Sequence, residues 1–373
     1  MDYSRPVPGK LMFEALKNER CIVMACNIRI GHSVRGIMMA AKEIDAAVLF
    51  EIAKSEIKYT GQNPRTFVDN ILKIAKELKF SQPYVIHGDH IGVKSPDPKD
   101  VESAATLIRD EIAAGFTSFA IDASHNFNAA APTVREQLKD NIEITTKLCG
   151  LIPKDASLEV EVGEVGKTDP TTGEKAITTV EEAVTYIKAI NENGYKPDLL
   201  ATNNGTSHGN IFDKNGKPIP KSINVERTGE IAKAIKPYGV RIAQHGITGT
   251  PLEYMPRLIE AGIAKGNVGT NWQNIAVAAM PKDLAKRMED WTLSCEESAK
   301  MRAKKPGCKD SELIGKNIKN AIVVFKSEID AIKGDDLRRI DEATKKGALE
   351  FFGAFNAKGT ASKVRAHIES KGL

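Results

Sequence analysis

Strand-like and helix-like segments alternate along most of this 373-residue chain. Eight short apolar runs that end in turn residues are predicted strands, at 21–28, 46–53, 84–91, 116–123, 156–162, 198–204, 239–245 and 266–271. Helical patterns lie between them, and several begin at Thr or Asp and end at Gly, at 64–80, 100–115, 133–150, 179–194 and 250–262. Strict alternation predicts an α/β fold with a parallel sheet and helices outside it. Eight units over about 250 residues predict a (β/α)8, or TIM, barrel, with a doubly wound open sheet as the main alternative.

The chain changes character after Trp272, where it becomes helical and highly charged. We therefore expect a barrel over residues 1–275 and a charged helical C-terminal extension over 276–373. The extension is predicted to pack on the barrel within a single structural domain. Arg338 or Arg339 is a candidate basic side chain that the extension lends to a site.

Composition excludes several classes of protein. The formal charge of +4 is mild, and basic residues are interleaved with acidic ones, which argues against a nucleic-acid partner and suits a small anionic substrate. The five cysteines are widely spaced without a CxxC pair, which favours a reducing compartment over a disulfide framework. No apolar run approaches the length of a membrane span. The sequence thus predicts a cytoplasmic protein without a membrane partner.

Three of the seven histidines, His90, His208 and His245, stand at the ends of predicted strands. Histidine is the commonest protein ligand of zinc-type metals, and three nitrogens leave a fourth coordination position for a substrate. The pattern predicts a catalytic metal site. The alternative is three hydrogen-bonded strand ends without a metal.

The active sites of such barrels lie at the carboxyl ends of the strands. Polar residues stand at these ends throughout the chain: Asn27, Asp89, His90, Asp122, Glu161, His208, His245, Asn267 and Thr270. A merely solvated rim would favour Lys, Glu and Ser over this set. We therefore expect these residues to converge on one site.

These residues belong to six blocks that occur in order between residues 20 and 275: "HGDH", "IDASH", "LEVEVGEVG", "GTSHGN", "HGITG" and "NVGTN". Together the blocks resemble the signature of class II, metal-dependent fructose-bisphosphate aldolases and their ketose-bisphosphate relatives. Each block alone is weak, whereas six in order with barrel spacing are specific. The residues after 275 carry no part of the resemblance.

The resemblance implies a zinc ion held by His90, His208 and His245, with another divalent transition metal as an alternative and a monovalent cation left open. The metal would act as a Lewis acid where negative charge develops on the ketone oxygen. Asp89 would transfer the proton of the hydroxyl at the scissile carbon; the alternative is an ordinary loop aspartate.

Further residues match positions near the metal and the substrate. Asp122 and Glu161 would support the ligands or act as alternative ligands; hydrogen-bonded interior residues are the plainer interpretation. Asn27 matches a residue at the reactive end of the substrate, although an ordinary polar barrel residue fits as well. His87 is expected to orient its neighbours. His32 and His125 are equally well explained as loop histidines, and His367 is expected at the surface.

Glycine-rich loops after the last strands predict a phosphate site, because glycine lets backbone N–H groups approach an anion. The candidate substrate-binding residues there are Gly209, Gly246, Thr248, Asn267 and Thr270, with simple turns as the alternative for the glycines. In the loop after the fifth strand, an ungapped count from Gly163 places Asp169 at the proton-abstracting position of the family. Glu164 and Glu174 compete for that role.

The chain departs from the family pattern at two places. Gly269 replaces an aspartate that normally contacts substrate hydroxyls, and Ala53 stands where a serine is usual, with Ser55 displaced by two. These changes leave the substrate less certain than the reaction. The resemblance implies cleavage of a phosphorylated ketose, with fructose 1,6-bisphosphate first and tagatose-type or other ketose phosphates as alternatives. It also implies a homo-oligomer, a dimer or tetramer.

Two hypotheses from other functional classes remain. A metal-dependent hydrolase barrel usually carries an HxH pair on its first strand, which "ACNIRIGHS" lacks. A non-catalytic barrel that binds a metal or a sugar phosphate is made plausible by Ala53 and Gly269.

Overall fold

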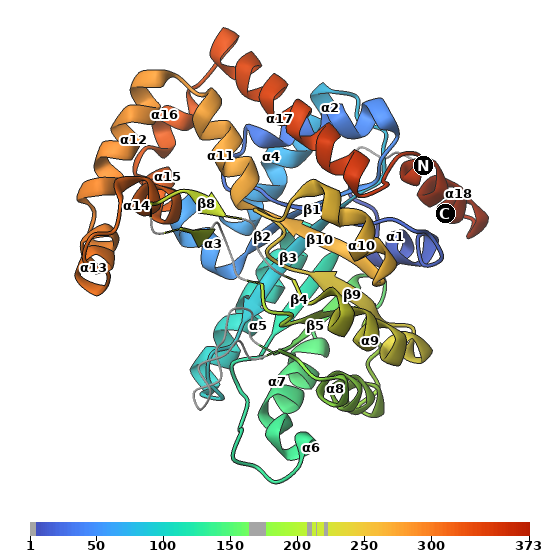
Figure 1. The fold of residues 1–373 in the computed structure, drawn as a ribbon. Coiled ribbons are helices and arrows are strands. Elements are labelled where there is room, and N and C mark those ends of the chain that lie inside the picture. Colours follow the sequence, from blue (N-terminus) through green and yellow to red (C-terminus); the bar gives the residue numbers. More distant parts are fainter. Residues whose placement is uncertain (1–4, 164–176, 207–210, 214, 220–222) are drawn as a thin grey trace.

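The predicted strands form a closed barrel in a computed structural model that describes residues 5–163, 177–206, 211–213, 215–219 and 223–373 (Figure 1). All neighbours in the barrel are parallel, in the order β1-β10-β9-β6-β5-β4-β3-β2. The strands are β1 (Val23–Asn27), β2 (Val48–Ala53), β3 (Tyr84–Gly92), β4 (Ser118–Asp122), β5 (Ser157–Val162), β6 (Leu199–Thr202), β9 (Arg241–Gln244) and β10 (Ile263–Val268). The closed order confirms the (β/α)8 prediction over the open sheet.

Helices cover the outside of the barrel (Figure 1). They are α2 (Ser33–Ile44), α3 (Lys54–Thr60), α4 (Pro64–Glu77), α5 (Pro98–Ala114), α6 (Val134–Gln137), α7 (Lys139–Cys149), α8 (Val180–Glu192), α9 (Val225–Ile235), α10 (Met255–Glu260) and α11 (Thr270–Ala279), with 3-10 turns η1 (Lys236–Tyr238) and η2 (Leu252–Tyr254). Capping residues fix several starts: the side chain of Asn63 accepts from the N–H of Thr66 at 2.9 Å, with Pro64 at the first position of α4. The single helix expected over 133–150 is two helices that meet at Leu138.

The amino end of the barrel is closed by apolar packing. Inward side chains of neighbouring strands, Leu49 and Val85, share a buried cluster with Phe13 on α1 (Gly9–Ala15) and Val364 on α18 (Thr360–Ser370). Because this end is filled, a substrate can enter only from the opposite end.

The C-terminal extension consists of helices that run along one side of the barrel (Figure 1). They are α12 (Lys282–Ser294), α13 (Glu296–Lys304), α14 (Asp310–Asn317), η3 (Ile318–Asn320), α15 (Ala321–Val324), α16 (Lys326–Asp330), α17 (Gly334–Ala354) and α18. The long helix α17 packs against α2, and α15 lies against α3. The predicted division at 275–276 falls inside α11. Among the described helices none is both long and apolar enough to cross a membrane.

A short hairpin follows β6 and reaches the extension. Its strands are β7 (Ile211–Phe212) and β8 (Pro218–Ile219), which pair antiparallel. A Cβ on Gly315 of α14 would lie 2.4 Å from the ring of Phe212, so the ring packs directly on this glycine.

Candidate active site

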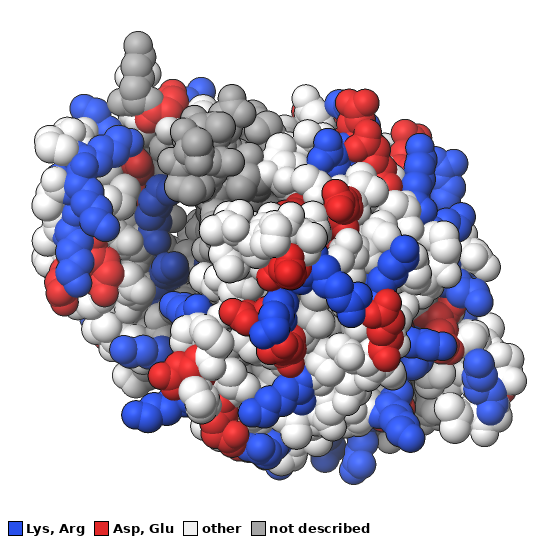
Figure 2. All heavy atoms as spheres, turned by 90° about the horizontal axis from the view of Figure 1, so that it is seen from below, with Lys and Arg blue, Asp and Glu red and all other residues white. Residues whose placement is uncertain are grey.

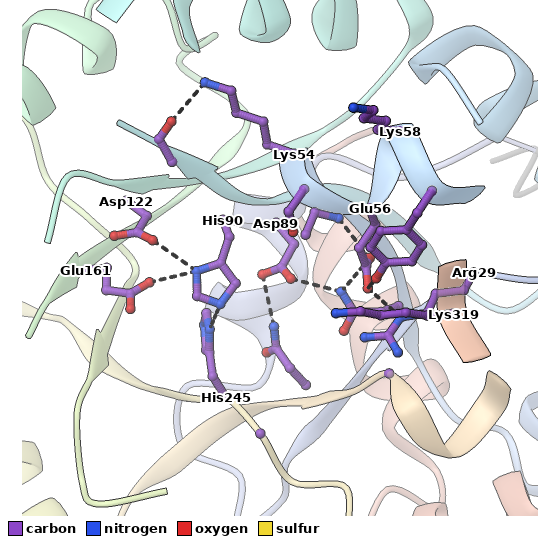
Figure 3. A pocket seen from close by; sticks show the side chains of 18 of the residues that line it. Arg29, Lys54, Glu56, Lys58, Asp89, His90, Asp122, Glu161, His245 and Lys319 are labelled. Atoms are coloured by element: carbon purple, nitrogen blue, oxygen red, sulfur yellow. Dashed lines mark hydrogen bonds and ion pairs between the residues drawn. The ribbon is translucent and has the colours of Figure 1, made fainter. Parts of the chain in front are cut away.

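Two histidines from different strands face each other at the carboxyl end of the barrel (Figure 3). His90 lies in β3 and His245 directly follows β9. The Nε2 atom of His90 and the Nδ1 atom of His245 are 2.5 Å apart, and the rings meet edge to face. The fold thus brings together two of the three predicted metal ligands.

A β-bulge turns His90 toward this site. Consecutive residues of a regular strand point to opposite faces, so Asp89 and His90 could not both face the barrel interior. The pairing of β3 with β4 shifts between Gly88 and Ile91, and His90 has a φ of +42°. Non-glycine residues rarely adopt this conformation, which is costly and is found most often at functional sites.

Carboxylates hold both rings by their outer nitrogens. The Nδ1 atom of His90 lies 3.2 Å from Asp122 and 3.1 Å from Glu161, and the Nε2 atom of His245 lies 2.7 Å from Glu159. A carboxylate only accepts, so each outer nitrogen carries a hydrogen. The remaining nitrogens, Nε2 of His90 and Nδ1 of His245, therefore face each other. Carboxylates that accept from the outer nitrogen orient metal-binding histidines in the same way.

This donor set fits a divalent cation. Burial lowers the pKa of His90, but Glu161 and Asp89 raise that pKa more, to well above its ordinary value. Asp122 and Glu161 thus concentrate negative charge at this ring, as a cation site requires. Ligand atoms of Asp89, His90 and His245 lie within 4.8 Å of one another. His90 and His245 would hold a metal ion by these two nitrogens, since metal binding displaces hydrogen from its ligand atoms.

Asp89 is held as an ionised carboxylate beside the histidines. Two amides donate to its oxygens, Nδ2 of Asn27 at 2.9 Å and Nδ2 of Asn267 at 3.0 Å. Burial raises the pKa of Asp89, but the charges of His90 and Lys265 outweigh burial and hold the pKa well below its usual range. Asp89 is therefore ionised, and a carboxylate can accept a proton only in this state.

A second layer of charged residues lies directly beneath, inside the barrel. Lys265 of β10 is fully buried and its Nζ lies 2.9 Å from Glu159 and 3.1 Å from Glu51. The same Nζ donates to Nε2 of His87 at 3.2 Å. Burial, followed by the charge of Lys265, lowers the pKa of His87 to about 3, so this ring stays neutral. His87 thus orients a neighbour rather than facing the metal position.

The mouth of the site carries an ion pair and an isolated lysine. Nε of Arg29 donates to Glu56 at 2.7 Å, and a second nitrogen donates to Thr270 at 3.2 Å. Lys319 comes from η3 of the extension, and its Nζ lies 5.3 Å from the ring centroid of Tyr59. Burial and then the charge of Arg29 lower the pKa of Lys319. No carboxylate in the described part of the chain pairs with this ammonium.

A known protein family matches most of this chain. The model of "Fructose-bisphosphate aldolase class-II" matches residues 7–329. The chain belongs to this family. Its members are lyases that depend on a metal ion.

Individual relatives are distant in sequence, and each match covers most of both chains. The chain is 23% identical over 321 residues to a fructose-bisphosphate aldolase of Nostoc sp., covering 76% of this chain and 82% of that protein. It is 26% identical over 280 residues to a fructose-bisphosphate aldolase of Geobacillus stearothermophilus, covering 74% and 85%. The structure of the YdjI aldolase from Escherichia coli K12 superposes with a TM-score of 0.60 at 18% identity, covering 94% of this chain and 98% of that one. At that identity the superposition supports the fold alone.

Most of the candidate residues for aldolase chemistry line one cavity of about 730 Å³. These are Asn27, Asp89, His90, Asp122, Glu161, His245, Gly246, Thr248, Asn267 and Thr270. His208, Gly209, Asp169, Glu164 and Glu174 lie outside the described residues.

The remaining histidines lie in three different places. His125 lines the cavity, whereas Nε2 of His32 lies 2.7 Å from the carbonyl of Ile329 at the seam with the extension. His367 lies on α18, and its Nε2 is 3.4 Å from the carboxylate of Glu14.

The extension reaches the aldolase site with a different residue from the one expected. Arg338 and Arg339 are exposed and pair with Asp335 and Asp336 on their own helix. Neither arginine lines the cavity, and their helix α17 packs against α2 and α11. Lys319 lines the cavity instead.

The departure at Gly269 has a local structural counterpart. A Cβ on Gly269 would lie 3.1 Å from Cβ of Asn27, so a side chain would crowd that residue. The carboxylate of Glu56 on α3 contacts the same Asn27, at 3.2 Å from Nδ2. An acidic group is thus present at this wall, but Arg29 already neutralises it.

Sequence reasoning missed Glu159, Lys265, Arg29, Glu56 and Lys319. One signal was available for Glu159, since it stands two residues before Glu161 and therefore faces the same side of β5. A lysine in a buried strand, two residues before Asn267, was the equivalent signal for Lys265.

Proposed function

We propose that this aldolase-family chain catalyses reversible, metal-dependent aldol cleavage of a phosphorylated ketose. Fructose 1,6-bisphosphate is the first choice, giving dihydroxyacetone phosphate and glyceraldehyde 3-phosphate. Other ketose phosphates of the tagatose type are the alternatives, since Gly269 and Ala53 alter the wall that would contact the aldehyde half.

One observation carries the proposal: the metal-facing nitrogens of His90 and His245 converge beside the ionised carboxylate of Asp89. His208, from the loop after β6, is proposed as the third ligand. When bound, the ion supplies Lewis-acid stabilisation of the negative charge that develops on the ketone oxygen.

The proton transfers fall to carboxylates of the chain. As the carbon–carbon bond breaks, the hydroxyl on the scissile carbon becomes an aldehyde, and its proton passes to Asp89. Asn27 and Asn267 hold Asp89 in place by donating to its two oxygens. The carbon left on the dihydroxyacetone phosphate half takes a proton in turn, for which Asp169 is proposed, with Glu164 and Glu174 as alternatives.

Basic side chains line the cavity beside its carboxylates, and an anionic substrate could pair with them. Lys and Arg side chains gather along a hollow on the face drawn in Figure 2. The basic residues that line the cavity are Arg29, Lys54, Lys58, Lys94 and Lys319. Gly246, with a φ of +67°, and Thr248 stand in the loop after β9, where a phosphate is expected to bind. Gly209 and Thr270 are proposed for the same subsite.

A Schiff-base mechanism through the buried lysine is disfavoured by its surroundings. Burial lowers the pKa of Lys265, but Glu159 and Glu51 raise that pKa more, to above its ordinary value. A lysine that remains protonated and ion-paired is not a nucleophile.

Finer properties extend the proposal. Zinc suits three imidazole ligands, and another divalent transition metal suits them as well. A monovalent cation near the phosphate, a dimeric or tetrameric assembly and a cytoplasmic location are also proposed.

The test is a metal-dependent cleavage panel. The protein is stripped with a chelator, supplied with zinc or cobalt, and assayed on fructose 1,6-bisphosphate, tagatose 1,6-bisphosphate and other ketose phosphates for release of dihydroxyacetone phosphate. We expect no activity without metal and recovery with it. His245→Ala should abolish recovery, whereas the matched variant His367→Ala should not.

Two outcomes would overturn the proposal. Cleavage that persists without metal, together with a borohydride-trapped adduct on Lys319 or Lys265, would indicate Schiff-base chemistry. A ligand-induced rise in melting temperature without turnover of any ketose phosphate would indicate a non-catalytic binding barrel.

A further inference from the structure

A buried lysine and a histidine share one carboxylate beneath the proposed metal position. The two oxygens of Glu159 have different partners: Oε1 lies 2.7 Å from Nε2 of His245, and Oε2 lies 2.9 Å from Nζ of Lys265. All three side chains are essentially inaccessible to solvent. Glu159 therefore links a strand-borne cation to a candidate metal ligand across the barrel interior.

The link is costly unless the charges balance. A buried carboxylate without a cation would lose its hydration without compensation. Lys265 is the one cation within ion-pair distance of Glu159 among the described residues, histidines aside. Its ammonium also contacts Glu51 at 3.1 Å, so two carboxyl groups meet a single lysine.

We propose that Lys265 is a positioning residue that keeps Glu159 as a fixed acceptor, so that Nδ1 of His245 faces the metal with its lone pair. The inference rests on the proposed metal-dependent function but concerns residues with no contact to substrate. This role depends on where the ring of His245 carries its hydrogen. As long as Glu159 accepts from Nε2, the hydrogen is on Nε2 and the metal-facing Nδ1 carries none.

The two carboxyl groups at Lys265 differ in what else they contact. Each glutamate turns one oxygen toward the ammonium, at 2.9 Å for Glu159 and 3.1 Å for Glu51. The other oxygen of Glu159 lies 2.7 Å from Nε2 of His245, whereas Glu51 makes no hydrogen bond or ion pair with His245 within the described structure. The two glutamates therefore give a matched pair of substitutions, of which only Glu159 contacts a proposed metal ligand.

The experiment compares Glu159→Gln with Glu51→Gln. Each removes one carboxylate oxygen at the same ammonium, and both sites are fully buried. In Glu159→Gln, Lys265 claims the amide oxygen, so the amide NH2 group faces His245 and forces its hydrogen onto Nδ1. We expect metal affinity, measured by competition with a chromophoric chelator, to fall about 10- to 100-fold. Glu51→Gln should leave the affinity within about twofold.

Lys265→Met provides the third arm. The methionine is similar in length but carries neither the charge nor the N–H donors of the lysine, so Glu159 loses its balancing cation and no longer remains a fixed acceptor at His245. We expect the same loss of metal affinity and a changed visible spectrum of the cobalt-loaded protein. If this variant fails to fold, the glutamine pair still decides the question.

The outcomes separate this inference from the proposed function. Equal metal affinities in Glu159→Gln and Glu51→Gln, with equal losses of melting temperature, would show a purely structural cluster and overturn the inference. A wild-type protein that binds no divalent metal would instead overturn the proposed function. Affinity is measured without substrate, so neither result depends on knowing the ketose.

Discussion

The inward side chains of β2 and β3 are Leu49 and Val85 at the amino end of the barrel, and two residues further along they are Glu51 and His87. The same alternation that packs one end therefore charges the other. The amino end is sealed by Phe13 and other apolar groups, and the carboxyl end encloses ion pairs and a cavity. One end of each strand contributes stability and the other chemistry, a division typical of this fold.

The charged end carries a structural cost that the apolar end does not. His90 has a positive φ, and the buried charge of Lys265 must be balanced by the carboxyl groups around it. Such arrangements persist because the surrounding barrel fixes them and function selects them. Substitutions at the carboxyl end should therefore change catalysis, and those at the amino end should change stability.

The largest effect is expected for Asp89→Asn. The amide keeps the size of the side chain but cannot take the hydroxyl proton, so kcat for ketose bisphosphate cleavage should fall roughly 10²- to 10⁴-fold. Steady-state kinetics and metal content measured together check this. Retention of kcat within a few-fold, with normal metal content, would remove Asp89 from the mechanism.

Phe13→Ala tests the opposite end. Phe13 is buried in the apolar cluster, so its truncation should lower the free energy of unfolding by about 3–5 kcal/mol. Denaturant titration measures this loss, and kcat per folded molecule should not change. Tyr254→Ala, at an exposed aromatic, is the control for truncation itself. A fall in kcat without a loss of stability would contradict the division between the ends.

The sequence predicted the barrel and the strand ends because both depend on local patterns. Polar residues at the ends of apolar runs marked Asp122, Glu161 and Asn267. Alternation alone would place Asp89 and His90 on opposite faces of the strand, and the bulge in the pairing of β3 with β4 that brings both to the interior has no local sequence pattern. The partnership of Lys265 with Glu159 depends on the stagger of strands far apart in sequence.

Lys319 lay beyond prediction for a different reason. It comes from a 3-10 turn about fifty residues after the last barrel strand, and only the packing of the extension brings it to the cavity. A lysine among many in a charged segment has no distinguishing local pattern.

Lys319→Ala should have the next largest effect. The ammonium points into the cavity beside Tyr59 and pairs with no carboxylate of the described chain, so it is available to an anionic group of the substrate (Figure 3). Loss of one charged contact of about 1.5 kcal/mol should raise KM roughly tenfold with a smaller change in kcat. Lys316→Ala, on α14 of the same extension, is the control. An unchanged KM at low salt would place the substrate anion elsewhere.

The smallest effect is expected where a carboxyl is buried without a catalytic role. Asp341 of α17 has its pKa raised to about 6 by burial, which Arg35 only partly offsets. Because this folded-state pKa exceeds the unfolded value, the protonated form stabilises the fold fully below about pH 4, and this stabilisation is lost as the pH rises through about 6. Asp341→Asn should therefore raise the free energy of unfolding at pH 8 by no more than about 1 kcal/mol. The melting temperature should rise slightly as a result.

The gain from Asp341→Asn should vanish at pH 4, where the wild-type carboxyl is already neutral. Thermal unfolding of both proteins across this pH range measures the difference, with the exposed Asp336→Asn as the control. Asp89 is more deeply buried yet has a lowered pKa, because cations at the carboxyl end of the barrel compensate it. A stability gain that does not depend on pH would show that Asp341 is compensated as well, and charge compensation would then not distinguish the carboxyl end of the barrel.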